Sequence, residues 1–303
     1  MIAAFVLSLA AAHEVTWTVP QIYVEGRPFR ARVTITATAK GDVPTWMFEP
    51  GAFTIDGQPL AERKNKEKIA VDNGSRLNLD LDIGAAIAAH KASKKHEFKL
   101  AFSGSDTKPV TVLSFVPAEK GMSFLDEKKM PAEKLAGYSV LLETNRGNMV
   151  LEMWPDVAPK HVRNFLDLAA TGFYDGTQFH RVMPGFMIQG GDPTTKDAAR
   201  QAEWGTGQGP RMLAPEFNKK RHVRGVLSMA RGDDPASASC QFFVMDAPAP
   251  DLDGKYSAFG LLIDGYDALD KIVSSPGTPL PGGNGTRPSE PQLILRAHVL
   301  EAR

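Results

Sequence analysis

The sequence predicts a mainly β protein, and three observations support this fold class. Apolar and polar residues alternate along several short stretches between His13 and Pro117. Clusters rich in glycine, proline, aspartate and asparagine separate these stretches, as turns do between strands. A second region, beginning at Tyr138, opens on a pattern typical of a β-hairpin and ends on another alternating run.

The N-terminal region, residues 13–117, has the pattern of strands with one buried and one solvated face. In "PFRARVTITATAK" the residues expected to face a core are Phe29, Ala31, Val33, Ile35 and Ala37. The stretches "RLNLDLDIG" and "HEFKLAFSG" repeat this alternation. Several such strands within about 100 residues favour an antiparallel β-sandwich. We find no catalytic motif in it, and a protein partner is one role that it could serve.

The second region, residues 138–303, begins after a charged segment, 118–137, which is interpreted as a linker with one helical turn. Two apolar runs in "YSVLLETNRGNMVLEMW" flank a polar turn and predict a hairpin. In "APKHVRNFLDLAATG", Pro159 suits a first helical turn, apolar residues recur at helical spacing, and Gly172 suits a C-terminal cap. These features predict a helix over residues 159–170.

Composition and charge exclude several classes of function. Lys plus Arg equals Asp plus Glu at 35 each, so no net positive field favours binding to nucleic acid. The local basic run around Lys219 and Lys220 is expected to be a solvated loop. Cys240 is the only cysteine, and the seven histidines form no HxxxH or HExxH pair. We therefore expect no disulfide, no metal and no cofactor.

The first twelve residues, "MIAAFVLSLAAA", are apolar and end in small side chains. This pattern is typical of a signal-peptide core with a cleavage site near Ala12, and it predicts an exported, periplasmic or extracytoplasmic protein. No basic residue precedes the apolar run. A buried first strand is the alternative interpretation, and it would be compatible with a cytoplasmic chain.

The stretch "FHRVMPGFMIQGGD", residues 179–192, combines apolar side chains with Arg181 and Gln189. Pro184 and Gly185 predict a turn, which would place Arg181 and Gln189 on adjacent strands facing the same side. An apolar pocket beside a few orienting polar groups is what a peptide-binding site requires. The adjacent pair Gly190 and Gly191 suggests a close approach of another backbone.

This stretch resembles the signature of the cyclophilin-type peptidyl-prolyl cis-trans isomerases. Two further motifs are similar to that family: "GVLSMARGDDPASASCQFFV", residues 225–244, and "LDGKYSAFGLLIDGYDALDKI", residues 252–272. The resemblance covers residues 138–303. It implies an eight-stranded antiparallel β-barrel closed by two helices, at 159–170 and 266–273, with "PQLILRAHVLEA" as the closing strand.

The resemblance also assigns the site. It implies that Arg181 is the catalytic arginine and that proline-containing peptide segments of client proteins are the substrates. The residues implied to bind substrate are Phe186, Met187, Gln189, Gly205, Ala230, Arg231, Gly232, Gln241, Phe243, Leu252 and Tyr256. Two positions depart from the family: Tyr256 stands for a frequent histidine, as in bacterial members, and Asp251 for a frequent tryptophan. The second change implies weak cyclosporin binding at most.

Isomerisation assists protein folding and requires a positioned donor rather than a cofactor. Twisting the X-Pro bond localises a lone pair on the proline nitrogen, so a donor such as Arg181 would bind the twisted state best. Two alternatives are a non-catalytic proline-binding or scaffold module recruited through the N-terminal domain, and a Cys-His hydrolase using Cys240 and His180. We expect the isomerase, acting as a monomer.

Overall fold

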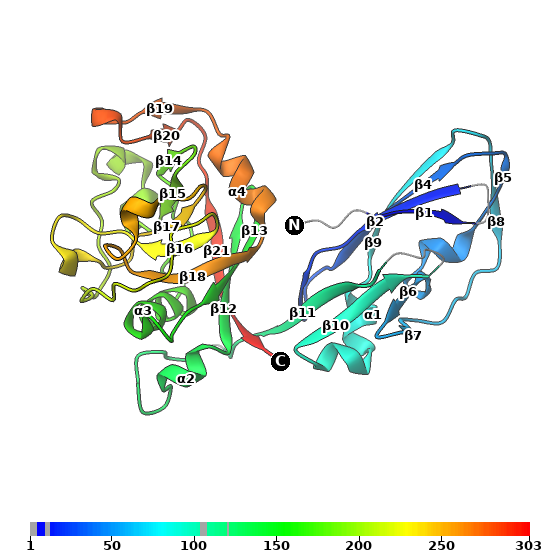
Figure 1. Cartoon of the computed structure of the whole chain (residues 1–303), viewed down its shortest axis with the longest axis horizontal. Coiled ribbons are helices and arrows are strands. Elements are labelled where there is room, and N and C mark those ends of the chain that lie inside the picture. The colour runs from blue at the N-terminus through cyan, green and yellow to red at the C-terminus, as the bar shows by residue number, and fades with distance from the viewer. Residues whose placement is uncertain (1–4, 10–12, 104–107, 120) are drawn as a thin grey trace. The chain divides into compact units, whose positions relative to one another are not determined.

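The computed structural model describes residues 5–9, 13–103, 108–119 and 121–303 (Figure 1). These residues form two compact units, one comprising Met1–Val116 with Ala302–Arg303 and the other Pro117–Glu301. In the described part of the chain, no helix combines the length and hydrophobicity that a membrane span requires.

The first unit is built from two layers of strands. One sheet has the order β1-β2-β4-β9 and is antiparallel throughout. The facing layer consists of β7, β6, β10, β11 and β3. A short antiparallel pair, β5 and β8, completes the unit. The bounds are β1 Phe5–Leu9, β2 His13–Thr18, β3 Ile22–Val24, β4 Arg30–Ala37, β5 Gly41–Pro44, β6 Phe53–Ile55, β7 Gln58–Pro59, β8 Lys68–Val71, β9 Arg76–Asp82, β10 Glu97–Phe102 and β11 Val110–Pro117, with the helix α1 at Gly84–Ala89.

The core of this unit lies between the two layers, as in a sandwich. The predicted inward face of β4 is buried, and its outward Arg30 and Arg32 are exposed. The Phe53 ring meets Trp17 of the facing sheet at 6.0 Å and its cross-strand partner Phe102 at 5.1 Å between centroids, both edge to face. The predicted sandwich is therefore present, with one departure: β3 pairs with β11 in parallel rather than antiparallel.

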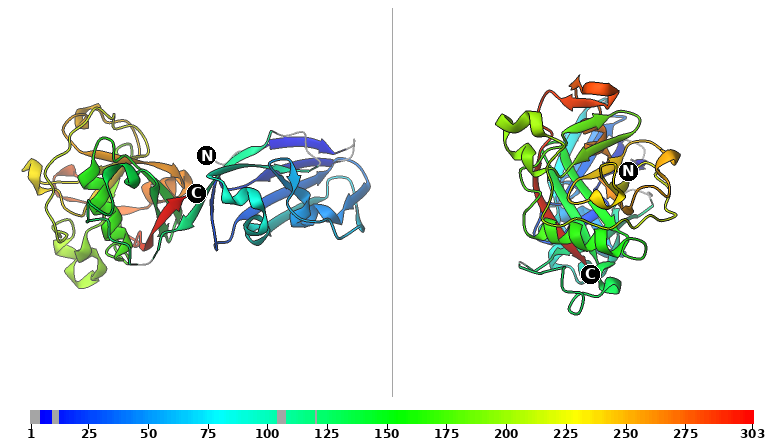
Figure 2. Two further views of the ribbon diagram at one scale, coloured as in Figure 1. Left: turned by 90° about the horizontal axis from the view of Figure 1, so that it is seen from below. Right: turned by 90° about the vertical axis from the view of Figure 1, so that its left-hand side faces the viewer.

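Eight strands of the second unit form an antiparallel ring in the order β14-β15-β17-β16-β18-β13-β12-β21. An antiparallel bridge between Gln178 and Leu293 joins the chain before β14 to the chain before β21, and so closes the ring. The amides of Gly176 and Ile294 donate across this seam at 2.8 Å each. In Figure 2 the red strand β21 lies beside the green strands of the barrel. The eight-stranded barrel that the resemblance implied is confirmed.

The bounds of these strands are β12 Tyr138–Thr144, β13 Gly147–Met153, β14 Arg181–Met183, β15 Met187–Gly190, β16 Val226–Met229, β17 Phe242–Met245, β18 Ala258–Asp264 and β21 Ile294–Ala302. A further hairpin, β19 Gly277–Pro279 and β20 Thr286–Pro288, extends the sheet beyond β14.

Two helices contribute apolar side chains to the barrel core, α3 at Pro159–Ala170 and α4 at Tyr266–Val273. Both have the bounds that the sequence predicted. Pro159 occupies the first turn of α3, and Gly172 follows its end with φ +72°. Within the core, the Phe165 ring lies 5.2 Å from those of Phe242 and Phe259.

The segment 118–137, interpreted as a linker, packs on the second unit. Phe124 and Leu135 are fully buried in its core, and Met130 is nearly so. The Arg163 guanidinium of α3 donates to the Phe124 carbonyl. The expected helical turn is α2, Ala132–Leu135. The burial of these apolar side chains and the contact with Arg163 hold the segment against the barrel.

The apolar N-terminus contains strand β1, which pairs with β2 from Phe5 opposite Trp17 to Leu9 opposite His13. The cleavage site expected near Ala12 lies outside the described residues. The signal peptide therefore stays a prediction.

Candidate active site

The hairpin of β14 and β15 carries the first group of predicted site residues. Arg181 and Gln189 lie directly opposite each other in its register, and the Arg181 Nη1 donates to Gln189 Oε1 at 3.0 Å. Gly185, with φ +74°, forms the tight turn between the strands, closed by the Phe186 amide donating to the Met183 carbonyl at 2.9 Å. The predicted placement of Arg181 and Gln189 on one side is confirmed.

The glycine pair after β15 is required by close packing. A Cβ on Gly190 would lie 2.9 Å from the Phe179 ring. Gly191 has φ +84°, and a Cβ there would lie 2.7 Å from the Cys240 carbonyl oxygen. Gly190 thus lets β15 lie against Phe179, and Gly191 lets the chain lie against Cys240, the residue before Gln241.

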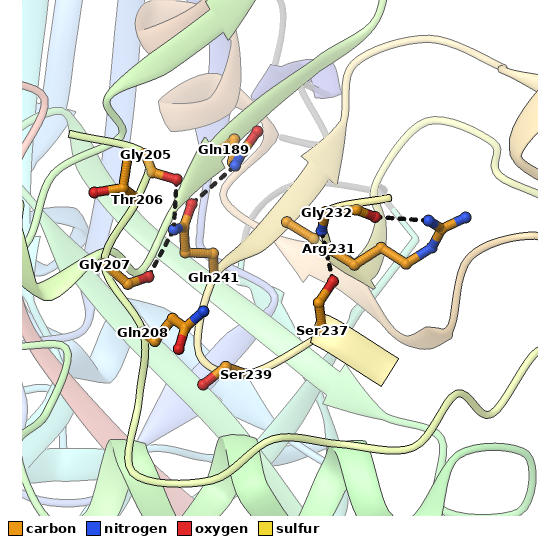
Figure 3. Close-up of a pocket in the computed structure, with 11 residues that line it drawn as sticks. Gln189, Gly205, Thr206, Gly207, Gln208, Arg231, Gly232, Ser237, Ser239 and Gln241 are labelled. Atoms are coloured by element: carbon orange, nitrogen blue, oxygen red, sulfur yellow. Dashed lines mark hydrogen bonds between the residues drawn. The ribbon is translucent and has the colours of Figure 1, made fainter. Parts of the chain in front are cut away.

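A chain of hydrogen bonds links Arg181 to the loop at Gly205. Gln189 Nε2 donates to Gln241 Oε1 at 3.0 Å. Gln241 Nε2 in turn donates to the carbonyls of Gly205 at 3.0 Å and Gly207 at 2.8 Å (Figure 3). These bonds fix the amide orientations of both glutamines, because each amide oxygen accepts and each amide nitrogen donates.

Arg181 is half-buried, and its guanidinium is held at two points. Besides the Nη1 contact, Nε donates to the backbone carbonyl of Asn284 at 2.7 Å. Among the described residues, none accepts a hydrogen bond from Nη2. Burial lowers the pKa of Arg181, and the nearby Tyr256 partly opposes this shift. The group stays cationic at neutral pH, since an arginine pKa starts above 12, and it presents a free donor.

An apolar cluster lies around β15 and β17. Met187 and Phe243 are buried in it, and Phe186, Leu252 and Tyr256 pack against it partly exposed. The Phe243 and Tyr256 rings meet edge to face at 5.8 Å between centroids. The structure thus brings together five of the residues that the resemblance implied to bind substrate.

His222, which no sequence motif marks, packs against the Phe243 ring of this cluster. Its ring is buried and stacks on Phe243 at 6.1 Å with 22° between the planes. Its ring nitrogens contact Asp253 Oδ1 at 3.1 Å and Ser228 Oγ at 3.0 Å. Burial lowers the pKa of His222, against the influence of Asp253, so the ring is neutral at physiological pH.

A polar pocket of about 240 Å³ borders this cluster, because Ala230 belongs to both. Its lining comprises Gln189, Gly205, Thr206, Gly207, Gln208, Ala230, Arg231, Gly232, Ser237, Ser239 and Gln241 (Figure 3). Six of these were predicted site residues. Thr206, Gly207, Gln208, Ser237 and Ser239 were missed, because they lie in loops without a recognisable pattern.

Arg231 contacts the apolar cluster and also lines the polar pocket. Its guanidinium lies 4.6 Å from the centroid of Tyr256, in the range of a cation–π contact. The same guanidinium donates through Nη1 to the Gly232 carbonyl at 2.7 Å. Ala230 packs against the apolar cluster, so the segment 230–232 borders both the cluster and the pocket.

Asp192 anchors the loop that forms one wall of the polar pocket. It is fully buried, and its Oδ1 accepts from the amide and the hydroxyl of Thr194 at 2.7 Å each. Its Oδ2 accepts from the amides of Gly205 at 2.5 Å and Gly207 at 3.2 Å. Four donors satisfy this buried carboxylate, which is the condition for burying a charge without an ion pair.

His180 and Cys240 do not form a nucleophilic pair. Burial lowers the pKa of His180 to about 4, although Asp192 opposes the shift, so the ring is neutral. Cys240 is fully buried, and burial raises the pKa of its thiol to about 12, with Asp192 adding to the effect. A buried thiol without a thiolate form is a poor nucleophile, which argues against the hydrolase alternative.

The described residues contain no group of three or more His, Cys, Asp or Glu side chains arranged to hold a metal ion. The site offers the cationic Arg181, with a free donor, near an apolar cluster.

Comparison with known proteins identifies a match over the barrel. Residues 139–299 match the family model described as cyclophilin type peptidyl-prolyl cis-trans isomerase/CLD. A probable peptidyl-prolyl cis-trans isomerase of Brucella suis is 43% identical over 140 residues, which cover 44% of this chain and 70% of that protein. An Arabidopsis thaliana isomerase, CYP18-1, is 42% identical over 148 residues, 46% of this chain and 86% of that one.

Solved structures similar to this chain include a cyclophilin type isomerase from Cryptosporidium parvum, crystallised in the presence of the dipeptide Ala-Pro. It is 32% identical, covers 53% of this chain and 98% of its own, and has a TM-score of 0.47.

Proposed function

Because the chain belongs to the cyclophilin type peptidyl-prolyl cis-trans isomerase family, it catalyses rotation about X-Pro peptide bonds, and we propose that Arg181 is the residue that stabilises the twisted bond. The observation that carries this proposal is the half-buried guanidinium, fixed at Nε and Nη1 with Nη2 free, on the hairpin that also carries Phe186 and Met187.

The chemistry requires a donor that discriminates between planar and twisted amides. Resonance gives the C–N bond double-bond character, and the barrier to rotation is roughly 18–20 kcal/mol. As the bond twists, the nitrogen lone pair localises and becomes a hydrogen-bond acceptor. A donor from Arg181 then binds the twisted state better than either planar state, which is the requirement for catalysis.

The neighbouring groups would hold the substrate while the bond turns. The cluster of Met187, Phe243 and Leu252 would take the proline ring and exclude water from the amide. Gln189 and the backbone of residues 230–232 would fix the chain that precedes proline. Immobilising the ring while the acyl side rotates provides the orientation that lowers the barrier further.

Arg181→Ala tests the proposal. One preorganised donor is worth roughly 3–4 kcal/mol, so the rate should fall on the order of a few hundredfold. Cis–trans exchange of an Ala-Pro peptide, followed by NMR, measures it. The matched control is Arg200→Ala, because Arg200 is an exposed arginine whose ion pair with Glu203 lies on the surface. Equal rates for wild type and Arg181→Ala would remove Arg181 from the mechanism.

The finer expectations are part of the same proposal. The substrates would be proline-containing segments of folding client proteins, handled by a monomer. Cyclosporin would bind weakly at most, since the exposed Asp251 stands where the family often has tryptophan. Isothermal titration with cyclosporin checks this, and submicromolar binding would contradict it.

Export is supported by the sequence of the first twelve residues alone. If the protein is exported, mass spectrometry of the mature chain should find a start near His13, and an intact Met1 would contradict export. As a separate part of the proposal, the N-terminal sandwich would recruit a protein partner. The family membership does not favour the alternative of a non-catalytic module.

A further inference from the structure

We propose that the loop between β19 and β20, residues 280–285, positions the Arg181 guanidinium through the backbone carbonyl of Asn284. This inference rests on the proposed catalytic role of Arg181. The hairpin of β19 and β20 extends the sheet beside β14 (Figure 1). It therefore reaches the site from a segment that lies outside the three motifs that define the site in sequence.

The contact fixes the plane of the guanidinium. Nε of Arg181 donates to the Asn284 carbonyl at 2.7 Å, and Nη1 donates to Gln189 Oε1 at 3.0 Å. A single contact would let the planar group rotate about that hydrogen bond. Two contacts at different nitrogens prevent this rotation and hold Nη2 in one direction. Asn284 thus complements Gln189, because the contact with Gln189 alone would leave the guanidinium free to rotate about that hydrogen bond.

The loop is itself held against β14. The Leu280 amide donates to the Gly285 carbonyl at 2.8 Å, which closes the loop. Thr286 pairs with Val182, and its hydroxyl donates to the Val182 carbonyl at 3.2 Å. Val182 follows Arg181 directly in the sequence, so the carbonyl of Asn284 is fixed relative to the backbone that carries the guanidinium.

Gly285 is the residue on which this arrangement depends. Its φ is +89°, and a Cβ there would lie 2.7 Å from the Val182 carbonyl oxygen. A side chain at this position would push the loop away from β14 and lengthen the Nε contact. Gly283 offers a matched comparison, because its φ is +72° and a Cβ there would meet nothing within 4 Å. The side chain of Asn284 does not carry the contact, since its Nδ2 instead donates to the Pro281 carbonyl at 3.3 Å.

The test compares Gly285→Ala with Gly283→Ala in the full chain, using NMR exchange of a saturating Ala-Pro peptide. A misplacement of about 1 Å at a catalytic group costs up to roughly a hundredfold, so we expect Gly285→Ala to lower the exchange rate at least about tenfold. Its dissociation constant for the peptide should stay unchanged. Gly283→Ala should keep the wild-type rate. Equal rates for the two glycine variants would overturn the inference.

A double-mutant cycle separates positioning from a general loss of structure. If Gly285 acts through Arg181, Gly285→Ala should have no further effect in an Arg181→Ala background. An additive loss would overturn the inference while leaving the role of Arg181 intact. If Arg181→Ala alone has no effect, the catalytic role of Arg181 fails first, and this inference fails with it.

Wild-type protein provides a second measurement that does not depend on how the variants fold. The Nε proton of Arg181 should exchange slowly with solvent in the free enzyme, because the Asn284 carbonyl accepts it. Exchange as fast as that of the exposed Arg30 would show that the contact is absent in solution and would overturn the inference.

Discussion

Asp192→Asn tests whether the buried carboxylate holds the wall of the polar pocket. The substitution keeps the size of the side chain and replaces one oxygen by an NH₂ group. If the remaining oxygen keeps its two contacts with Thr194, the new NH₂ group faces the amides of Gly205 and Gly207. Those two backbone N–H groups then lose their acceptor, and they point at the N–H donors of the new amide instead.

The expected loss follows from these contacts. A hydrogen bond to a charged group is worth roughly 1.5–3 kcal/mol, and two are lost, while the neutral amide recovers part of the cost of burying a charge. We therefore expect the free energy of unfolding to fall on the order of 3 kcal/mol. The amide resonances of Gly205 and Gly207 should also lose the downfield shift that a carboxylate acceptor produces.

Urea denaturation measures the change, and Asp197→Asn is the matched control. Asp197 is exposed, and its Oδ1 accepts from the Ala199 amide at 2.8 Å at the start of a short 3₁₀ helix, residues 198–203. Asparagine caps a helix about as well as aspartate, so this control should change stability little. If Asp192→Asn destabilises the protein no more than Asp197→Asn, the anchoring role of Asp192 is wrong.

Two further predictions concern the buried groups beside the site. The pKa of His180 is lowered to about 4 from 6.5, so the unfolded chain binds a proton between these values and the folded chain does not. The stability that neutral His180 preserves is complete above pH 6.5 and is lost as the pH falls towards 4, by about 3 kcal/mol in total. His180→Gln should lose less stability than wild type over that range in urea titrations, and equal losses would contradict the assignment. Because the pKa of Cys240 is raised to about 12, iodoacetamide at pH 8 should alkylate it only after denaturation; rapid labelling of the native protein, read by mass spectrometry, would contradict its burial.

Local signals in the sequence predicted the helix α3 and the buried face of β4. Pro159 and Gly172 mark the two ends of α3, and alternation in the segment 29–37 identifies the inward face of β4. Such features depend on residues close together in the chain, so they can be read without knowledge of the fold.

The parts that the sequence did not reveal depend on contacts between distant residues. Asn284 holds Arg181 through a backbone carbonyl, which any residue type could supply, so no side-chain pattern marks it. In the sequence, Asp192 is an ordinary polar residue after a glycine pair. Its role in anchoring the loop at Gly205 is visible only from its burial and its contacts in the fold. The segment 118–137 is interpreted as a linker because charges and a proline interrupt the alternation of apolar and polar residues. The burial of its few apolar residues, Phe124 and Leu135, follows from contacts with distant residues.

The proposed mechanism requires Arg181 to bind the twisted imide rather than the ground state. NMR exchange and titration of one Ala-Pro peptide with Arg181→Ala measure both the rate of isomerisation and the dissociation constant. We expect the rate to fall on the order of a few hundredfold while the dissociation constant remains close to that of wild type. A dissociation constant weakened by the same factor, with the rate on the bound peptide unchanged, would show that Arg181 only binds substrate and would contradict this mechanism.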